Sequence, residues 1–154
     1  IANSQDQAEN LIAEVIANGS ALEKFRQMCI QQGVKETTAK ALIDNPNSVL
    51  PNSEHITEIA VSKAGYVSDI DSMKLADIAR KHGAGRFSIE DEIIPEVGFD
   101  ICVERGQHVE AGSAWLKFHH NESLSEAEVA ELSNSLITSP KKVEVKSRLI
   151  SIIE

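Results

Sequence analysis

The amino-acid sequence predicts an α+β protein in which an N-terminal helical hairpin is followed by a β-rich α/β domain. Apolar residues recur at helical spacing over residues 5–33. In several short segments between residues 54 and 120, apolar and polar residues instead alternate, as they do in half-buried strands. Turn-forming residues crowd residues 44–53, between the two regions. We therefore assign residues 1–45 to a helical segment and residues 46–154 to the α/β domain.

Capping boxes mark the two helices expected in the helical segment. Ser4 and Gln7 have the spacing of a capping box, as do Ser20 and Glu23, and Gly19 between them is typical of a helix end. Each helix carries an apolar face. The side chains of these faces are Ala8, Leu11, Ile12, Val15, Ile16, Leu22, Phe25, Met28 and Cys29. A two-helix hairpin buries too little to offset the entropy of its ordering, so we expect this segment to belong to a preceding domain that is absent here.

The β-rich domain is expected to be built around one helix. This helix covers residues 72–82, because Asp71 and Ser72 are both good N-cap residues and Gly83 stands where a left-handed C-cap is expected. The expected strands are residues 55–61, 66–70, 97–103 and 115–118. Gly106 and Gly112 bracket a valine ahead of the last of these strands, a pattern typical of a β-sandwich or barrel corner.

Two further helices complete the expected elements. Residues 34–43 predict a short helix before the turn-rich stretch. Ser125 and Glu128 form a third capping box, which predicts a helix that ends before Pro140. The buried stripe of this last helix is expected to contain Leu132, Leu136 and Ile137.

Charge argues against a nucleic-acid-binding protein. The chain has 154 residues and a formal net charge of −9 at pH 7, whereas proteins of that class present a basic face to the phosphates. The local basic cluster is Lys141, Lys142, Lys146 and Arg148. It alternates in part with valines and precedes apolar residues 149–153, which favours a strand with charged edges over a phosphate-binding patch. We expect no nucleic-acid partner.

The sequence also indicates where the protein resides. No stretch has the length and apolarity of a membrane span, and residues 1–4 show neither an initiator methionine nor the blocks of a signal peptide. We expect a cytoplasmic protein without a membrane partner, and a chain that begins within a longer protein. Cys29 and Cys102 form no disulfide framework and are expected to be buried apolar fillers.

Several polar residues could form a catalytic or metal site, but structural roles account for them more simply. His119 and His120 point to opposite faces of an expected strand, and no further ligands are spaced to complete a site, so we expect surface histidines and no metal. Asp69 and Asp71 share one face, as an acid/base pair does, yet they also suit a strand end and a helix cap. His82 suits the C-terminus of its helix.

Lys74 raises an alternative function. Residues 72–75, Ser-Met-Lys-Leu, resemble the lysine hairpin of biotinyl and lipoyl carrier domains, and Gly106, Val109 and Gly112 resemble the strand pattern that follows that lysine. A carrier lysine projects from a tight turn between strands, whereas Lys74 lies in the first turn of an expected helix. A carrier domain and a non-catalytic interaction module are the alternatives to the family described next.

A set of short motifs, in order along the chain, resembles the C-terminal part of the thymidine/pyrimidine nucleoside phosphorylase family. The motifs of the α/β domain are Tyr66-Val67-Ser68, Ile70-Asp71, Leu75-Ala76, Gly83-Ala84-Gly85-Arg86, Asp91, Ile93, Val97-Gly98-Phe99, Gly106, Val109 and Gly112. Those of the helical segment are Gly19, Ala21, Phe25, Met28, Gln32 and Gly33. The resemblance covers nearly the whole chain, and it implies a hammerhead-like, barrel-sandwich arrangement for the α/β domain.

The resemblance also implies an activity for a longer parent protein. That parent would be a homodimeric enzyme in which phosphate attacks the anomeric carbon of a pyrimidine nucleoside and releases the base and a pentose 1-phosphate. The phosphate and base motifs of the family lie in its N-terminal part, and none of them occurs in this sequence. We therefore expect no catalytic residue in this stretch, an inactive fragment, and no cofactor, with phosphate as the co-substrate.

The resemblance assigns a substrate-closing loop to residues 83–92, with Gly83, Gly85, Arg86 and Ser88 as its site residues. Three acids end this segment, and their charge would repel phosphate at close range. We therefore expect any direct contact with an anion to come from Arg86 or from the glycine amides.

Overall fold

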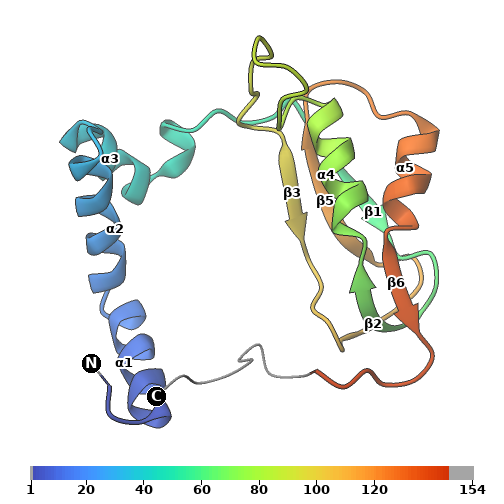
Figure 1. The fold of residues 1–154 in the computed structure, drawn as a ribbon, viewed down its shortest axis with the longest axis horizontal. Coiled ribbons are helices and arrows are strands. Elements are labelled where there is room, and N and C mark those ends of the chain that lie inside the picture. Colours follow the sequence, from blue (N-terminus) through green and yellow to red (C-terminus); the bar gives the residue numbers. More distant parts are fainter. Residues whose placement is uncertain (1, 146–154) are drawn as a thin grey trace. The chain divides into compact units, whose positions relative to one another are not determined.

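The computed structural model describes residues 2–145 and divides the chain into two compact units, residues 1–52 and 53–154. Within the described residues there are five α-helices, one 3-10 helix and two three-stranded antiparallel sheets (Figure 1). The predicted α+β class is confirmed at this level, and the hammerhead-like, barrel-sandwich arrangement stays a prediction. The strand expected around Lys146 and Arg148 lies outside the described residues.

The N-terminal unit consists of helices. They are α1 (Gln5–Ala17), α2 (Ser20–Gln31), α3 (Glu36–Asp44) and the 3-10 helix η1 (Pro46–Ser48). Figure 1 shows α1 leading into α2 around a bend, whereas α3 folds back beside α2. An ion pair of 3.4 Å between Arg26 and Glu36 joins α2 to α3. The hairpin is therefore formed by α2 and α3. The prediction of a hairpin over residues 5–33, which contain α1 and α2, is wrong.

One predicted cap is also wrong. Ser4 caps α1 as expected, since its hydroxyl accepts from the Gln7 amide over 3.2 Å. At α2 the N-cap is Gly19, with φ of +76°, and Ser20 is already helical. The bend between α1 and α2 is too short for an extended cap residue, and the Asn18 side chain accepts from the Ser20 amide instead, over 2.9 Å.

The C-terminal unit contains two sheets with interleaved connectivity. Its strands are β1 (His55–Ala60), β2 (Gly65–Ile70), β3 (Gly98–Ile101), β4 (His108–Val109), β5 (Ala114–His120) and β6 (Leu136–Ser139). The strand orders are β1-β5-β3 in one sheet and β4-β2-β6 in the other, and all pairs are antiparallel. Consecutive strands therefore always fall in different sheets.

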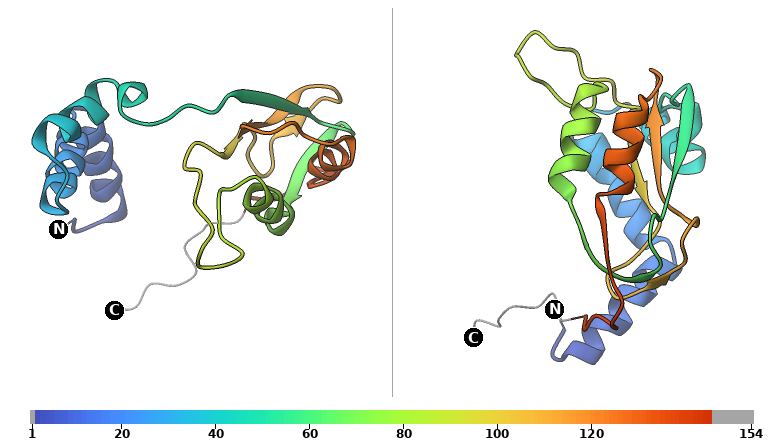
Figure 2. Two further views of the ribbon diagram at one scale, coloured as in Figure 1. Left: turned by 90° about the horizontal axis from the view of Figure 1, so that it is seen from above. Right: turned by 90° about the vertical axis from the view of Figure 1, so that its right-hand side faces the viewer.

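Two helices complete this unit and cover its core. They are α4 (Ser72–Lys81) and α5 (Glu126–Ser133), which lie side by side in both Figure 1 and Figure 2. The buried core contains Ile59, Val61, Val67, Leu75, Ile78, Val97, Val103, Val109, Trp115, Leu116, Phe118, Leu132 and Leu136. Leu75 and Ile78 come from α4, and Leu132 comes from α5, so both helices bury an apolar face as the sequence predicts.

The last predicted helix is too long. It ends at Ser133, and Leu136 and Ile137 belong to β6, where they pair with Ile70 and Asp69 of β2. Leu136 is buried and Ile137 is 47% exposed, as expected for neighbours on opposite faces of a strand. Pairing with the distant strand β2 therefore overrides the helical spacing of these residues.

Neither cysteine is a buried filler. Cys29 is half-buried on α2, and Cys102 is exposed. Cys102 directly follows β3, which is an edge strand, so little packs over it. Among residues 2–145, no helix combines the length and the apolarity needed to cross a membrane.

Candidate functional site

The four predicted site residues lie in one loop between α4 and β3. This loop, residues 83–94, is called the Gly83 loop below. Figure 1 and the right-hand view of Figure 2 show it, in yellow-green, projecting beyond the end of α4 and away from the sheets of its own unit. A segment in this position can contact another body without disturbing the core.

The Gly83 loop begins with a Schellman motif. Gly83 has φ of +100°, and its amide donates to the Arg80 carbonyl over 3.1 Å. The Ala84 amide donates to the Ala79 carbonyl over 2.9 Å. A Cβ on Gly83 would stand 2.6 Å from Cδ1 of Ile94, so both the backbone and the available space demand glycine. The left-handed C-cap predicted at Gly83 is confirmed.

Two sets of hydrogen bonds fix the conformation of the loop. At its base the Ile94 amide donates to the Gly83 carbonyl over 2.8 Å. At its tip the Asp91 carboxylate accepts from the amides of Phe87 (2.7 Å) and Ser88 (2.9 Å). The Ser88 hydroxyl donates to the same carboxylate over 3.1 Å. The two amides, that of Ser88 first, hold the pKa of Asp91 below its ordinary value, so this carboxylate is ionised at neutral pH.

These bonds decide which predicted site residues are available to a ligand. Gly83 donates its amide to the last turn of α4, and Ser88 has both its amide and its hydroxyl on Asp91. Gly85 lies against an α4 side chain, where an added Cβ would meet a carbon at 3.3 Å. Arg86 is exposed and forms no ion pair with any residue in the described part of the chain. Arg86 is therefore the predicted site residue best placed to meet an anion.

The apolar tip of the loop was not predicted from the sequence. Phe87 and Ile89 are 65% and 88% exposed, and the Arg80 guanidinium lies 4.1 Å from the centroid of the Phe87 ring. The closure of the tip by Asp91 was not predicted either, although Ser88 and Asp91 have the three-residue spacing at which a carboxylate can accept from a serine amide. No periodic pattern indicates that Phe87 and Ile89 face outward.

The histidines of β5 are not the surface pair that the sequence predicted. His120 is 3% exposed; its Nδ1 donates to the Glu122 carbonyl over 2.7 Å, and its Nε2 lies 2.8 Å from the Thr57 hydroxyl. His119 is partly exposed, with Nε2 3.0 Å from the Asp100 carboxylate. His120 is buried because it lies on the same face of β5 as Leu116 and Phe118, which pack in the core. Within residues 2–145, no cluster of three or more His, Cys, Asp or Glu residues could hold a metal ion.

His82 joins the end of α4 to the start of α5. Its Nε2 lies 3.3 Å from Oε1 of Glu128, and its ring meets the Phe118 ring edge-on at a centroid distance of 5.3 Å. Glu128 also accepts from the amide (3.0 Å) and the hydroxyl (2.7 Å) of Ser125. The Ser125 amide, followed by its hydroxyl and by His82, lowers the pKa of Glu128. The predicted capping box is confirmed, and it anchors the residue that immediately precedes the Gly83 loop.

Asp69, near the end of β2, and Asp71, directly after it, have structural roles. Asp71 is the N-cap of α4 and accepts from the Lys74 amide over 3.3 Å. Asp69 accepts from the amide of its neighbour Ile70 over 2.9 Å. Lys74 lies in the first turn of α4, with its Nζ 3.2 Å from the Asp71 carboxylate. The aspartates therefore form no acid/base pair, and the lysine does not project from a hairpin.

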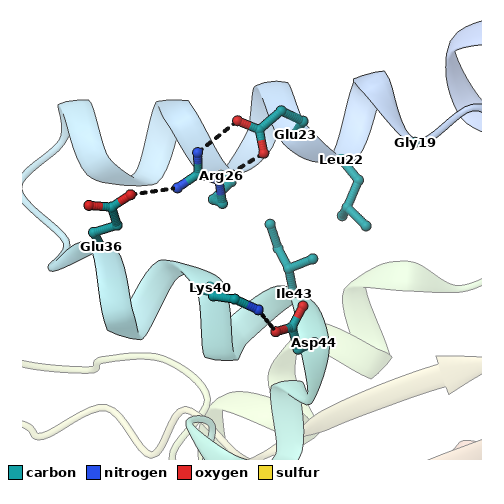
Figure 3. A pocket seen from close by; sticks show the side chains of 8 residues that line it. All are labelled: Gly19, Leu22, Glu23, Arg26, Glu36, Lys40, Ile43 and Asp44. Atoms are coloured by element: carbon teal, nitrogen blue, oxygen red, sulfur yellow. Dashed lines mark hydrogen bonds and ion pairs between the residues drawn. The ribbon is translucent and has the colours of Figure 1, made fainter.

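A hollow between α2 and α3 offers no site for an anion. Its volume is about 440 Å³, and Figure 3 shows the lining residues Gly19, Leu22, Glu23, Arg26, Glu36, Lys40, Ile43 and Asp44. Arg26 binds Glu23 at 2.8 Å and also reaches Glu36, and Lys40 pairs with Asp44. The bond to Arg26 lowers the pKa of Glu23 to about 2. Both cations are thus already neutralised, which is typical of a structural cluster.

The sequence around the Gly83 loop matches a known protein family. Residues 66–139, which run from β2 to β6 and include the whole loop, match the model of the pyrimidine nucleoside phosphorylase C-terminal domain. These residues belong to the C-terminal domain of that family. The resemblance identified from the sequence motifs is therefore confirmed.

Curated relatives extend the match into the helical segment. The pyrimidine-nucleoside phosphorylases of Staphylococcus aureus strains USA300, NCTC 8325 / PS 47 and COL are each 33% identical to this chain over 135 residues. The alignment covers 88% of this chain and 30% of each relative. The chain thus spans less than a third of the length of these enzymes.

Proposed function

We propose that this chain is the C-terminal part of a pyrimidine nucleoside phosphorylase and that the Gly83 loop closes over the substrate cleft of that enzyme. The observation that carries the proposal is that residues 66–139 match the C-terminal domain of the family and contain the entire loop. The relatives that share 33% identity are pyrimidine-nucleoside phosphorylases by name. A loop that is fixed at its base and projects from its unit suits a closing role.

The proposed reaction is phosphorolysis. A phosphate oxygen forms a bond to the anomeric carbon of the nucleoside, the bond from that carbon to the base nitrogen breaks, and the base leaves with the electron pair and is protonated. This requires phosphate held in line with the breaking bond and donors that stabilise charge on the base, which takes several convergent groups. The Gly83 loop offers a single exposed cation, Arg86. We therefore assign the catalytic residues to the rest of the parent enzyme, with phosphate as the co-substrate.

Arg86 is the residue through which the loop contacts substrate in this proposal. Its guanidinium carries five donors and can bind a phosphate oxygen or a polar group of the nucleoside. Glu90 and Glu92 are exposed and would repel phosphate at close range, whereas Asp91 is turned towards the amides of the loop. Loop closure would also exclude water from the reacting centre.

The helices α1 and α2 support the assignment of residues 1–45 to the preceding domain of the parent. Neither helix contains a buried residue. Their large apolar side chains with more than a third of their surface exposed are Leu11, Ile12, Val15, Ile16, Leu22, Phe25 and Met28. Exposed apolar faces of this kind are normally covered by another apolar surface, and we propose that the preceding domain covers those of α1 and α2. We further propose that the parent acts as a cytoplasmic homodimer.

The carrier alternative has less support. Lys74 is part of a regular helix and is paired with Asp71 at 3.2 Å, so its amine is not presented on a turn for attachment of biotin or lipoate. An unmodified intact mass, from cells able to attach these groups, would exclude that function. An interaction module would instead bind a partner with no enzyme attached, and the assay below separates it from the proposed function.

The proposal is tested by phosphorolysis assays on the parent protein, with thymidine and uridine side by side, and on this chain alone. We expect turnover by the parent, and neither turnover nor phosphate binding by the chain. Arg86→Ala in the parent should lower kcat/KM about 10- to 100-fold, or about 1.4 to 2.8 kcal/mol, which is the effect of one lost lid contact. Arg105→Ala, at another exposed arginine of the same unit, is the matched control. An inactive parent refutes the function, and equal activity of the two variants refutes the role of Arg86.

A further inference from the structure

Apolar side chains of the Gly83 loop are exposed to solvent, most of all at its tip. Ile89 is 88% exposed, Phe87 is 65% exposed, and Ile93, later in the same loop, is 49% exposed. By contrast, Ala84 and Ile94, at the two ends of the loop, pack against the core of the C-terminal unit. The loop is therefore anchored by its ends, and among residues 53–145 no apolar side chain covers its tip.

The outward position of the tip is built into the structure. Asp91 accepts three hydrogen bonds from Phe87 and Ser88, which closes the tip into a compact turn. Arg80 lies over the Phe87 ring at 4.1 Å and supports it from α4. Because the turn is already ordered, a surface that receives it gains apolar contact without meeting most of the entropy cost of ordering a flexible loop.

The charges beside the tip restrict which surface can receive it. Glu90 and Glu92 are exposed on either side of Asp91, so negative charges are close in sequence to Phe87 and Ile89. Burial of the tip against an acidic or neutral surface would leave these carboxylates unpaired. The complementary surface is therefore an apolar hollow with lysine or arginine side chains at its rim.

From these observations we infer that Phe87 and Ile89 seat the Gly83 loop, when it closes, in a basic-rimmed apolar hollow on the remainder of the parent enzyme. The inference rests on the proposed function and names the contacts that would hold the closed state. The remainder of the parent is the chosen occupant because the curated relatives match this chain over only 30% of their length, so most of such an enzyme lies outside the chain. Phe87 and Ile89 are positioning residues: they hold Arg86 at the cleft and touch no reacting atom.

The test uses Phe87→Ala and Ile89→Ala in the parent protein. Each should lower kcat/KM for phosphorolysis about tenfold, equivalent to about 1.4 kcal/mol. The matched control is Ile101→Ala, which removes a similarly exposed side chain (53%) at the end of β3 that lies far from the loop in Figure 1. The control should retain full activity. Thermal melts of all three variants should match that of the unaltered parent, because none of the side chains is buried.

Hydrogen exchange gives a readout that does not depend on turnover. Phosphate together with the free base should slow amide exchange in residues 86–93 of the parent, and Phe87→Ala and Ile89→Ala should abolish this protection. Replacing Glu90 and Glu92 by glutamine together should weaken the protection and reduce its sensitivity to salt, because the contacts with the basic rim are lost.

The outcomes separate this inference from the function on which it rests. A parent without phosphorolysis refutes the proposed function and the inference with it. An active parent whose Phe87→Ala and Ile89→Ala variants keep full activity and full protection refutes the seating of the tip alone. Full protection with unchanged salt sensitivity in the glutamine double variant refutes the basic rim.

Discussion

Replacing Gly83 by alanine should destabilise the C-terminal unit through two separable effects. A side chain at φ of +100° is strained, which costs about 1 kcal/mol. The new Cβ would also stand 2.6 Å from Cδ1 and 2.8 Å from Cγ1 of Ile94. Ile94 packs against the core, so its displacement adds about 1 to 2 kcal/mol. The free energy of unfolding should therefore fall by about 2 to 3 kcal/mol in total.

Two other glycines of the same unit separate these effects. Gly112 has φ of +86° with nothing within 4 Å of an added Cβ, so Gly112→Ala should show the strain alone, about 1 kcal/mol. Gly98 has open space and no left-handed conformation, so Gly98→Ala should be neutral or slightly stabilising. Urea unfolding followed by fluorescence of Trp115, the sole tryptophan and fully buried in this unit, measures all three. If Gly83→Ala costs no more than Gly112→Ala, the contact with Ile94 does not constrain the loop.

Three further predictions concern acid stability, a helix cap and the boundary between the units. The pKa of Glu128 is lowered in the folded protein, so its contribution to stability is present above its ordinary value of 4.5 and is lost as the pH falls through the folded-state value. Glu128→Gln should therefore reduce the loss of stability below pH 4.5, by less than about 1 kcal/mol in the free energy of unfolding. Urea unfolding at a series of pH values from 7 to 3 measures this difference. Ser125→Ala, which removes the cap, should cost about 1 kcal/mol at pH 7. A protease of broad specificity should cut the chain first between Asp44 and Ser53, and earlier cleavage within residues 66–118 would contradict this boundary.

Helices and their ends could be predicted because their signals are local. The caps at Asp71 and Ser125 and the glycine after α4 are encoded within a few residues of the bonds that they make. Leu136 and Ile137 show where local signals fail: their spacing continues the stripe of α5, but their partners on β2 lie far away in the sequence. Composition gave no indication of that pairing.

The sequence predicted the glycine cap at the start of the Gly83 loop but not the conformation of the loop tip. The resemblance pointed to Gly83 and Arg86, and local spacing could have added Asp91. The exposure of Phe87 and Ile89 could not be predicted, because an apolar residue outside a periodic segment carries no sign of the direction in which it points. The burial of His120 depends on which face of β5 packs on the core, which only the assembled fold determines.

The interleaved strand order has a consequence for how the protein is made. None of the six described strands pairs with the strand next to it in the chain. His55 of β1 can pair only once His120 has been synthesised, and Ile70 of β2 pairs with the equally distant Leu136. Such long-range pairing is slow compared with hairpin formation, since large loops must close first. During synthesis, β1, β2 and β3 leave the ribosome before any of their partners exists. We therefore expect the C-terminal unit to fold only after β5 and β6 have emerged, and its apolar strands to remain unpaired until then.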